Sequence, residues 1–450
     1  MRNLYTLALS LLLLGGNLNA LAAEPAETTA DKKAKTQETV KKALSHLELH
    51  GFVRTYFAFD TRESSAGTED LYYYMPKDIK LSPAGEDLND QMSFRFAALT
   101  SRVWLDVKGF EVGAYNIGGR IEADFFAGVN GVTGTAQLRL RQAFVSVARD
   151  GRLWKIGQTW HPMAADMPDI FSLDTGVPFG PFNRSPQVNL DWKINDWFGI
   201  TAAALWQMQY TSTGLAGASA DYIKYSLTPE CYLGINFYTK KSLFRIGGDI
   251  LSIKPRWNNA TWDSANKKWN NDATAKVKDR LTTYNAYIYA QTKADNWTFK
   301  GKVTYAQDGG HMNLVGGYGV SGILEDGISY SYTPNQTISA WFTAMAKFGN
   351  WQPQMFLGYI ENMGAYKGIL SKDVLGTAKD PFYEKNSAST LARMYRIQPE
   401  LIYNLGKLQF GIEYMLTGVH YGTADAYKHA TTDLHWVLNH RVQALVKFNF

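Results

Sequence analysis

The side chains best suited to act on a dissolved molecule are arginines in alternating, extended segments and aspartates in one proline-rich segment. The arginines with this placement are Arg54, Arg95, Arg120, Arg139, Arg141, Arg184 and Arg396. Asp166, Asp169 and Asp174 lie in segment 160–184. Carboxylates that face guanidinium groups across a water-filled passage create a transverse field that sorts solutes by charge. The set therefore predicts the lining of a constriction that prefers anions.

A plainer interpretation stays open for these charges. Four further basic residues share the polar phase, namely Arg102, Lys155, Lys300 and Lys302. Charges inside a barrel can simply pair with one another, for example Arg120 with Glu122 or Asp124. In that case they would stabilise the wall and leave no field for a solute.

Residues for catalysis or metal binding show no informative spacing. A hydrolase needs a Ser–His pair oriented by Asn or Asp, and no such pattern accompanies His435 or His440. The eight histidines include no pair at metal-ligand spacing beside a carboxylate. Cys231 is the sole cysteine, which excludes a disulfide framework. We expect no catalytic residue, no metal and no other cofactor.

The charged residues must be carried by strands, because polar and apolar residues alternate along most of the chain. In the last ten residues one face carries Arg441, Gln443, Lys447 and Asn449, broken only by Leu445, and the other carries Val442, Ala444, Val446, Phe448 and Phe450. Soluble sandwiches also alternate. However, the same pattern recurs at 53–59, 121–125, 244–251 and 410–416. An apolar outer face with a polar inner face is typical of an outer-membrane barrel.

Short and long connections take turns between these segments. The short ones lie near 108–109, 150–151, 195–196, 240–241, 295–296, 349–350 and 405–406. The long ones cover roughly 61–91, 129–135, 160–184, 211–219, 256–278, 309–334, 362–389 and 421–433. The pattern predicts an all-β, antiparallel transmembrane barrel of about sixteen strands over 48–450, with short periplasmic turns and long outer loops. It treats 222–239 as one bent strand despite Pro229, because a further strand would put the next loop on the wrong side.

The loop at 160–184 contains many prolines and aromatic residues, which favours a folded loop over a loose one. We expect it to fold into the barrel as a constriction. The alternative is a loop that lies on the rim or clasps a neighbouring subunit.

The first 47 residues differ from the rest. Residues 1–23 combine Arg2, a short apolar run and the small-residue site Ala20-Leu21-Ala22, which predicts a cleaved secretory signal. Residues 24–47 form a polar segment with some helical character, expected in the periplasm. Phe448 and Phe450 then resemble the aromatic tag that barrel-assembly machinery recognises. The predicted location is the outer membrane of a Gram-negative bacterium.

Three segments carry a resemblance to a known family. They are Leu49–Asp60, Arg139–Val147 with Ile156–Trp160, and Arg184–Val188. The chain resembles the trimeric Gram-negative outer-membrane porins, closest to their DcaP-like, Bacteroides-type branch. The resemblance implies sixteen strands, a homotrimer, an N-terminal periplasmic segment and a loop folded into each pore. It also implies passage of small solutes, with dicarboxylates for one branch. Trp160-His161-Pro162-Met163 departs from the family, whose members more often have Ser or Thr there.

Together these features predict a porin, not an enzyme, for passive diffusion of small hydrophilic and preferentially anionic solutes. The expected partners are outer-membrane lipid, the assembly machinery, two further copies of the chain and the solutes, with no nucleic acid. The alternatives are a plugged structural or adhesive barrel and, more remotely, an outer-membrane hydrolase.

Overall fold

The computed structural model describes residues 44–129, 132–263, 265–377 and 380–450. The chain divides into two units, Met1–His46 and Leu47–Phe450. The predicted signal at 1–23 and nearly all of the segment at 24–47 lie outside the described residues. Within the described residues, no helix has the length and apolar character needed to cross a membrane.

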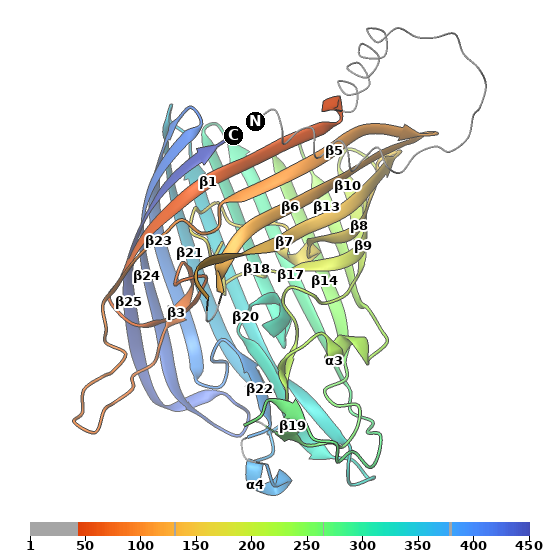
Figure 1. Cartoon of the computed structure of the whole chain (residues 1–450), viewed down its shortest axis with the longest axis vertical. Helices are drawn as coiled ribbons and strands as arrows, with labels where there is room; N and C mark the ends of the chain where they lie inside the picture. Colours follow the sequence, from red (N-terminus) through yellow and green to blue (C-terminus); the bar gives the residue numbers. More distant parts are fainter. Residues whose placement is uncertain (1–43, 130–131, 264, 378–379) are drawn as a thin grey trace. The chain divides into compact units, whose positions relative to one another are not determined.

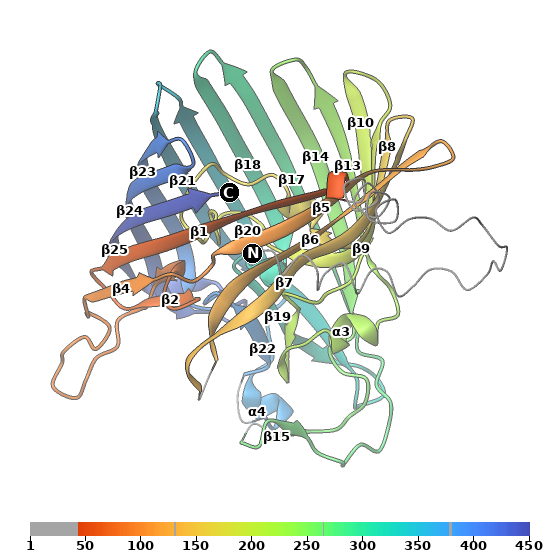
Figure 2. The ribbon, with the colours of Figure 1, turned by 45° about the horizontal axis from the view of Figure 1, so that its top comes forward.

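Residues 47–450 form a closed antiparallel barrel of sixteen strands, as the alternation predicts (Figures 1 and 2). In chain order the wall consists of β1 (Leu47–Asp60), β4 (Ser93–Ala97) continued by β5 (Arg102–Val112), β6 (Tyr115–Val129), β7 (Val132–Arg149), β8 (Arg152–Trp160), β9 (Arg184–Lys193), β10 (Phe198–Leu205), β13 (Glu230–Tyr238), β14 (Ser242–Ile253), β17 (Leu281–Ala294), β18 (Trp297–Gln307), β20 (Tyr330–Ala346), β21 (Trp351–Ala365), β23 (Leu391–Leu405), β24 (Leu408–Ala424) and β25 (Ala430–Asn449). Each strand pairs with its neighbours in the chain, so every connection in the wall is a hairpin.

The barrel closes between its first and last strands. The β1–β25 register runs from Phe52 opposite Asn449 to Asp60 opposite Arg441. The Phe450 backbone N–H donates to the Gly51 carbonyl at 2.9 Å, and the Gly51 N–H donates back to the Phe450 carbonyl at 3.1 Å. A Cβ on Gly51 would lie 2.5 Å from Cζ of Phe450, so this glycine is needed for the closing contact.

The alternation of the last strand separates the two faces of the wall. Arg441 and Gln443 are buried inside the barrel, whereas Val446, Phe448 and Phe450 are exposed on its outside. Leu445 points inward with the polar residues and packs in a buried cluster with Phe171 and Leu173 of the 160–184 loop. The one break in the polar face therefore marks the place where that loop touches the wall.

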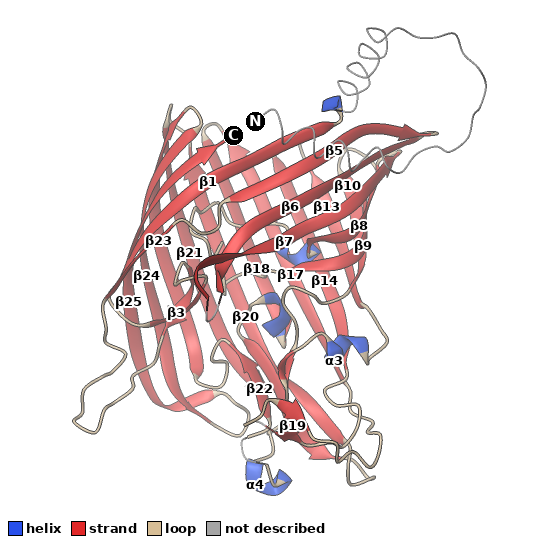
Figure 3. Cartoon of the chain, viewed as in Figure 1, coloured by secondary structure: helices blue, strands red, loops and turns tan. Residues whose placement is uncertain are grey.

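The long connections leave the barrel wall at one end, some of them fold back inside it, and they contain the short helices of residues 47–450 (Figure 3). The β8–β9 connection holds the single turn η2 (Pro162–Ala164), and the β10–β13 connection holds β11 (Thr213–Gly214), β12 (Gly217–Ala218) and α3 (Asp221–Lys224). Farther along lie β15 (Trp262–Asp263), β16 (Lys268–Trp269), η3 (Gly309–Met312), β19 (Gly316–Ile323), α4 (Lys372–Leu375) and β22 (Phe382–Lys385). The first connection forms a hairpin of β2 (Ser64–Gly67) and β3 (Tyr72–Pro76).

Three details of the predicted topology are wrong, although the strand count is right. The predicted strand at 222–239 is not continuous, because residues 221–224 form α3 and β13 begins only at Glu230, directly after Pro229. Proline lacks the N–H that a ladder needs, and here it ends a loop instead of bending a strand. The loop becomes longer without adding a strand.

The other errors concern turns. The predicted turn at 108–109 is a bulge between Val107 and Phe110, and β5 continues to Val112 before the chain turns at Gly113, whose φ is +60°. The predicted long connection at 129–135 is mostly strand, since β6 ends at Val129 and β7 begins at Val132. The register of this pair shifts at several points, which simple alternation does not reveal.

Candidate functional site

The segment between β8 and β9 is tied to the inner face of the wall by three ion pairs, one for each of its aspartates. The pairs join Asp166 to Arg245 of β14 at 2.5 Å, Asp169 to Lys300 of β18 at 2.7 Å, and Asp174 to Arg396 of β23 at 2.8 Å. These strands lie progressively farther from β8 around the barrel. The segment therefore runs along the inner wall from β14 to β23, inside the barrel and away from its rim.

Apolar contacts also hold the same segment against the inner wall of the barrel. Phe171, Leu173, Val177 and Phe182 are buried together with Leu445 and other residues of the wall. Farther along, Phe179 packs so closely on β21 that a Cβ on Gly358 would come within 2.6 Å of its ring. Burial of aromatic rings of this size contributes a few kcal/mol each. The ion pairs and the rings together fix the course of the segment.

A cavity of about 320 Å³ lies between this segment and the strands β1, β5 and β7. Its basic lining consists of Arg54, Arg102, Arg139, Arg141 and Lys447. The loop side contributes Asp169 and residues 170–173, and aromatic rings come from Tyr72, Phe126, Trp160, Phe182 and Tyr210. One wall of the cavity is thus basic, and the other mixes apolar and aromatic side chains with uncharged polar ones such as Gln352, Gln354 and Gln409.

Two carboxylates neutralise only part of the basic wall. Arg139 donates to Asp124 through Nε and Nη2 at 2.9 and 3.0 Å. Arg141 contacts both Glu122 and, at 2.9 Å, Asp124. Arg102 approaches the same two carboxylates at 3.5 and 3.6 Å. Three guanidinium groups therefore share two negative charges.

The remaining cations of this wall have no carboxylate partner in the described part of the chain. The Arg54 Nε donates to the Thr100 hydroxyl at 2.7 Å, and its guanidinium lies over the rings of Phe52 and Tyr56. Lys447 lies over the Phe52 ring at 4.6 Å. The cavity wall consequently carries a net positive charge.

Arg184 adds a further cation directly behind the cavity. Its side chain is fully buried and lies against Trp160 at 4.4 Å and Phe182 at 5.1 Å from the ring centroids. Across the described residues, none accepts a hydrogen bond from any of its three guanidinium nitrogens. A buried cation that lacks a protein acceptor adds strongly to the local potential, because little solvent screens it.

The other predicted arginines do not line this cavity. Arg95 forms an exposed ion pair with Asp70 at 2.7 Å, and Arg396 is buried beneath the loop. Arg120 pairs with Asp106 at 2.6 Å, whereas the sequence suggested Glu122 or Asp124. Arg120 and Asp166 line a second cavity of about 510 Å³, which shares Trp160 with the first.

Sequence reasoning missed the contribution of the first connection. Its hairpin buries Tyr72 and Tyr73 within the barrel. The Tyr74 carbonyl accepts from Arg396 at 2.8 Å, and the Asp70 carbonyl accepts from Arg441 at 2.9 Å. Burial, with smaller effects from the neighbouring tyrosines, raises the pKa of the Tyr72 hydroxyl well above 10, so that it stays neutral. The aromatic run 71–76 was the available signal for this packing.

No protein-family model matches the chain, and no curated protein matches it. Among solved structures, the outer membrane channel DcaP of Acinetobacter baumannii has a TM-score of 0.59 at 18% identity, covering 90% of this chain and 97% of that chain. The outer membrane protein OmpT of Vibrio cholerae has a TM-score of 0.50 at 11% identity, covering 90% and 97%. At these identities the likeness establishes the fold alone, a closed antiparallel barrel of sixteen strands.

Proposed function

We propose that this chain is an outer-membrane porin that lets small hydrophilic solutes diffuse passively and favours anions. The barrel has an apolar outside and a charged inside, which suits a lipid exterior around an aqueous interior. The segment 160–184 runs inside the barrel, where Asp166, Asp169 and Asp174 pair directly with basic residues of the wall, and this course supports a constriction. Passive diffusion through such a barrel involves no chemical reaction, because the solute needs only an open path.

The observation that carries the anion preference is the unequal charge around the first cavity. Six cations, counting Arg184 behind it, lie at this cavity, against the shared pair Glu122 and Asp124 and against Asp169, which is already paired with Lys300. A concave site that carries one sign of charge between low-dielectric walls concentrates counter-ions within it. Small anions would therefore reach the narrow region at a higher local concentration than cations of the same size.

Reconstitution into lipid vesicles tests whether a pore exists. We expect vesicles with the purified protein to swell in an isotonic solution of a small neutral sugar, and to swell more slowly as the sugar grows. A plugged structural or adhesive barrel would give no swelling at any size. That result, with heat-modifiable electrophoretic mobility proving that the barrel is folded, would refute the porin proposal.

We also propose the remaining features of a trimeric porin for this chain. They are export by the signal at 1–23, a periplasmic segment at 24–47, and assembly guided by Phe448 and Phe450. The two phenylalanine rings lie 6.4 Å apart on the outer face, exposed by 43% and 42%. Chemical crosslinking in detergent should give a species of three chains.

A further inference from the structure

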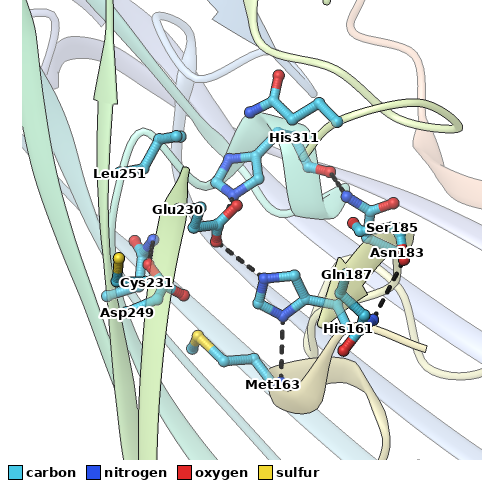
Figure 4. A network of polar contacts seen from close by, with 12 residues as sticks. His161, Met163, Asn183, Ser185, Gln187, Glu230, Cys231, Asp249, Leu251 and His311 are labelled. Carbon is cyan, nitrogen blue, oxygen red and sulfur yellow. Dashed lines mark hydrogen bonds and ion pairs between the residues drawn. The ribbon is translucent and has the colours of Figure 1, made fainter. Parts of the chain in front are cut away.

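A second polar cluster lies inside the barrel, apart from the basic cavity. It consists of His161, Glu230, Asp249 and His311 (Figure 4). His161 and His311 are fully buried, and Glu230 and Asp249 are exposed by only 1% and 6%. Nothing in the proposed permeation path requires two imidazoles and two carboxylates at this place.

Four separate segments bring these residues together. His161 begins the 160–184 segment, Glu230 and Asp249 lie on the paired strands β13 and β14, and His311 lies in η3. Asn183, at the end of the same segment, holds both histidines. Its carbonyl accepts from the His161 N–H at 3.1 Å, and its side-chain Nδ2 donates to the His311 carbonyl at 2.9 Å. The positions of the imidazoles are thus set by backbone contacts.

The spacing of the donor atoms fits one small ion. Nε2 of His161 lies 2.8 Å from Oε1 of Glu230, and Nε2 of His311 lies 3.4 Å from the same oxygen. Single ligand atoms of His161, Glu230 and Asp249 all lie within 4.8 Å of one another. Tetrahedral ligands about 2.1 Å from a zinc ion are roughly 3.4 Å apart. Small adjustments of the His161, Glu230 and Asp249 side chains would therefore supply three ligands. His311, whose Nε2 approaches only the Glu230 carboxylate of this group, would turn toward the ion as the fourth.

The cluster also has unmet polar groups and an unbalanced charge. Oδ1 of Asp249 accepts from Asn285 at 2.7 Å, but Oδ2 is buried without a partner in the described residues, as is Nδ1 of His311. Within the same residues, neither Glu230 nor Asp249 forms an ion pair with a lysine or arginine. Two buried carboxylates without a permanent cation are costly, and buried carboxylates are usually paired or bound to metal.

We propose that His161, Glu230, Asp249 and His311 bind one divalent transition-metal ion of the zinc class. Imidazole nitrogen suits zinc and its neighbours, whereas Ca²⁺ and Mg²⁺ prefer oxygen ligands alone. Cys231 follows Glu230 in the chain but is exposed on the other face of the strand, so it is not a ligand. The ion would fasten the start of the 160–184 segment and the η3 turn to the wall.

Metal binding would change the existing contacts of both histidines. Bonds to the ion would replace the contacts of the two Nε2 atoms with Glu230. Nδ1 of His161 accepts from the Met163 N–H at 3.2 Å, which puts the ring proton on Nε2. Coordination through Nε2 moves that proton to Nδ1, and the Met163 N–H loses its acceptor. Asp249 keeps its hydrogen bond from Asn285, which orients the free oxygen toward the ion as an outer partner commonly does.

The test is metal retention by the full chain, purified in detergent without a polyhistidine tag. Glu48, His50 and Asp106 could also hold a metal, so every protein in the series carries Glu48→Gln. After chelation, loading with Zn²⁺ and removal of free ion, we expect about one zinc per chain by elemental analysis. Glu230→Gln and Asp249→Asn, which keep shape but remove charge, should reduce retention to background.

The neighbouring Cys231→Ser serves as the matched control and should retain zinc fully. Loading with Co²⁺ should give visible absorption bands in the parent protein, and these bands should vanish in the two carboxylate variants. Loss of zinc to equimolar Ca²⁺ would overturn the proposed metal class. Absence of retained zinc in the parent protein would overturn the site itself, however the variants fold. Neither result depends on whether the barrel conducts.

Discussion

At the scale of single residues, the inside of the barrel contains two kinds of buried arginine. One kind is paired with a carboxylate, and the other has no carboxylate partner among the described residues. Arg396 is fully buried and bonded to Asp174, Val177 and Tyr74, so it supports the loop. Arg184 is equally buried, but within the described residues its guanidinium contacts aromatic rings and finds no hydrogen-bond acceptor. We therefore expect Arg396 to contribute to the stability of the fold, and Arg184 to contribute to the electric field inside the barrel.

Asp174→Asn tests the structural kind. The change leaves the Arg396 charge buried without its carboxylate, and breaking a buried pair typically costs about 3–5 kcal/mol. We expect the temperature at which the barrel loses its heat-resistant mobility to fall clearly. Asp70→Asn is the control, because its pair with Arg95 is about half exposed and should cost less than about 1 kcal/mol. Equal shifts for the two variants would contradict the assignment.

Arg184→Met tests the electrostatic kind. Methionine keeps an apolar stem against Trp160 and Phe182 but removes a buried charge that lacks an acceptor among the described residues. The thermal transition should stay in place or rise, because desolvating an unpaired charge is unfavourable. The ratio of chloride to potassium permeability should fall. A large loss of stability with unchanged permeability would assign Arg184 a structural role instead.

At the scale of elements, the 160–184 segment is the part that should control passage. Replacing Asp166, Asp169 and Asp174 with Asn removes all three ion pairs to the wall, so the segment should move more freely. We expect larger and noisier single-channel conductance. The control replaces Asp150, Asp295 and Asp373, three exposed aspartates, and should leave the currents unchanged. Identical currents in both triple variants would place the segment outside the conducting path.

The closing strand provides a second test at this scale. Val446 and Lys447 are neighbours in β25, but Val446 faces outward and Lys447 lines the cavity. Val446→Arg places a charge on the apolar face, at a cost of up to about 2–4 kcal/mol in lipid. Urea titration of vesicle-folded protein should show this loss, whereas Lys447→Arg should stay close to the parent. If Val446→Arg left the free energy of unfolding unchanged, Val446 would not face lipid.

The elements that could be predicted are those with a local signature. Alternation revealed the sixteen strands and the inward phase of residues such as Arg139 and Arg141. The start of β13 could not be placed, because Tyr222 and Ile223 read as strand residues although they are buried in α3. Leu445 looked like an error in an otherwise polar face, and only the packed loop explains it.

The sites depend on contacts that are distant in sequence. The bonds from Glu230 to His161 and His311 span 69 and 81 residues, which no motif spacing can express. The partner of Arg120 was likewise open, since three acidic residues lie within reach of its strand and the register selects Asp106. Residue types predicted a basic lumen, but the choice among partners required the register and the course of the loop.

At the scale of the whole molecule, we propose that the barrel is an open pore whose interior favours anions. The direct measurement is the reversal potential of the parent protein in a planar bilayer under a tenfold gradient of potassium chloride. We expect a reversal potential of the sign set by chloride, and we expect its magnitude to fall at higher total salt, because salt screens the arginines. A potential of the opposite sign, set by potassium, would contradict the proposal.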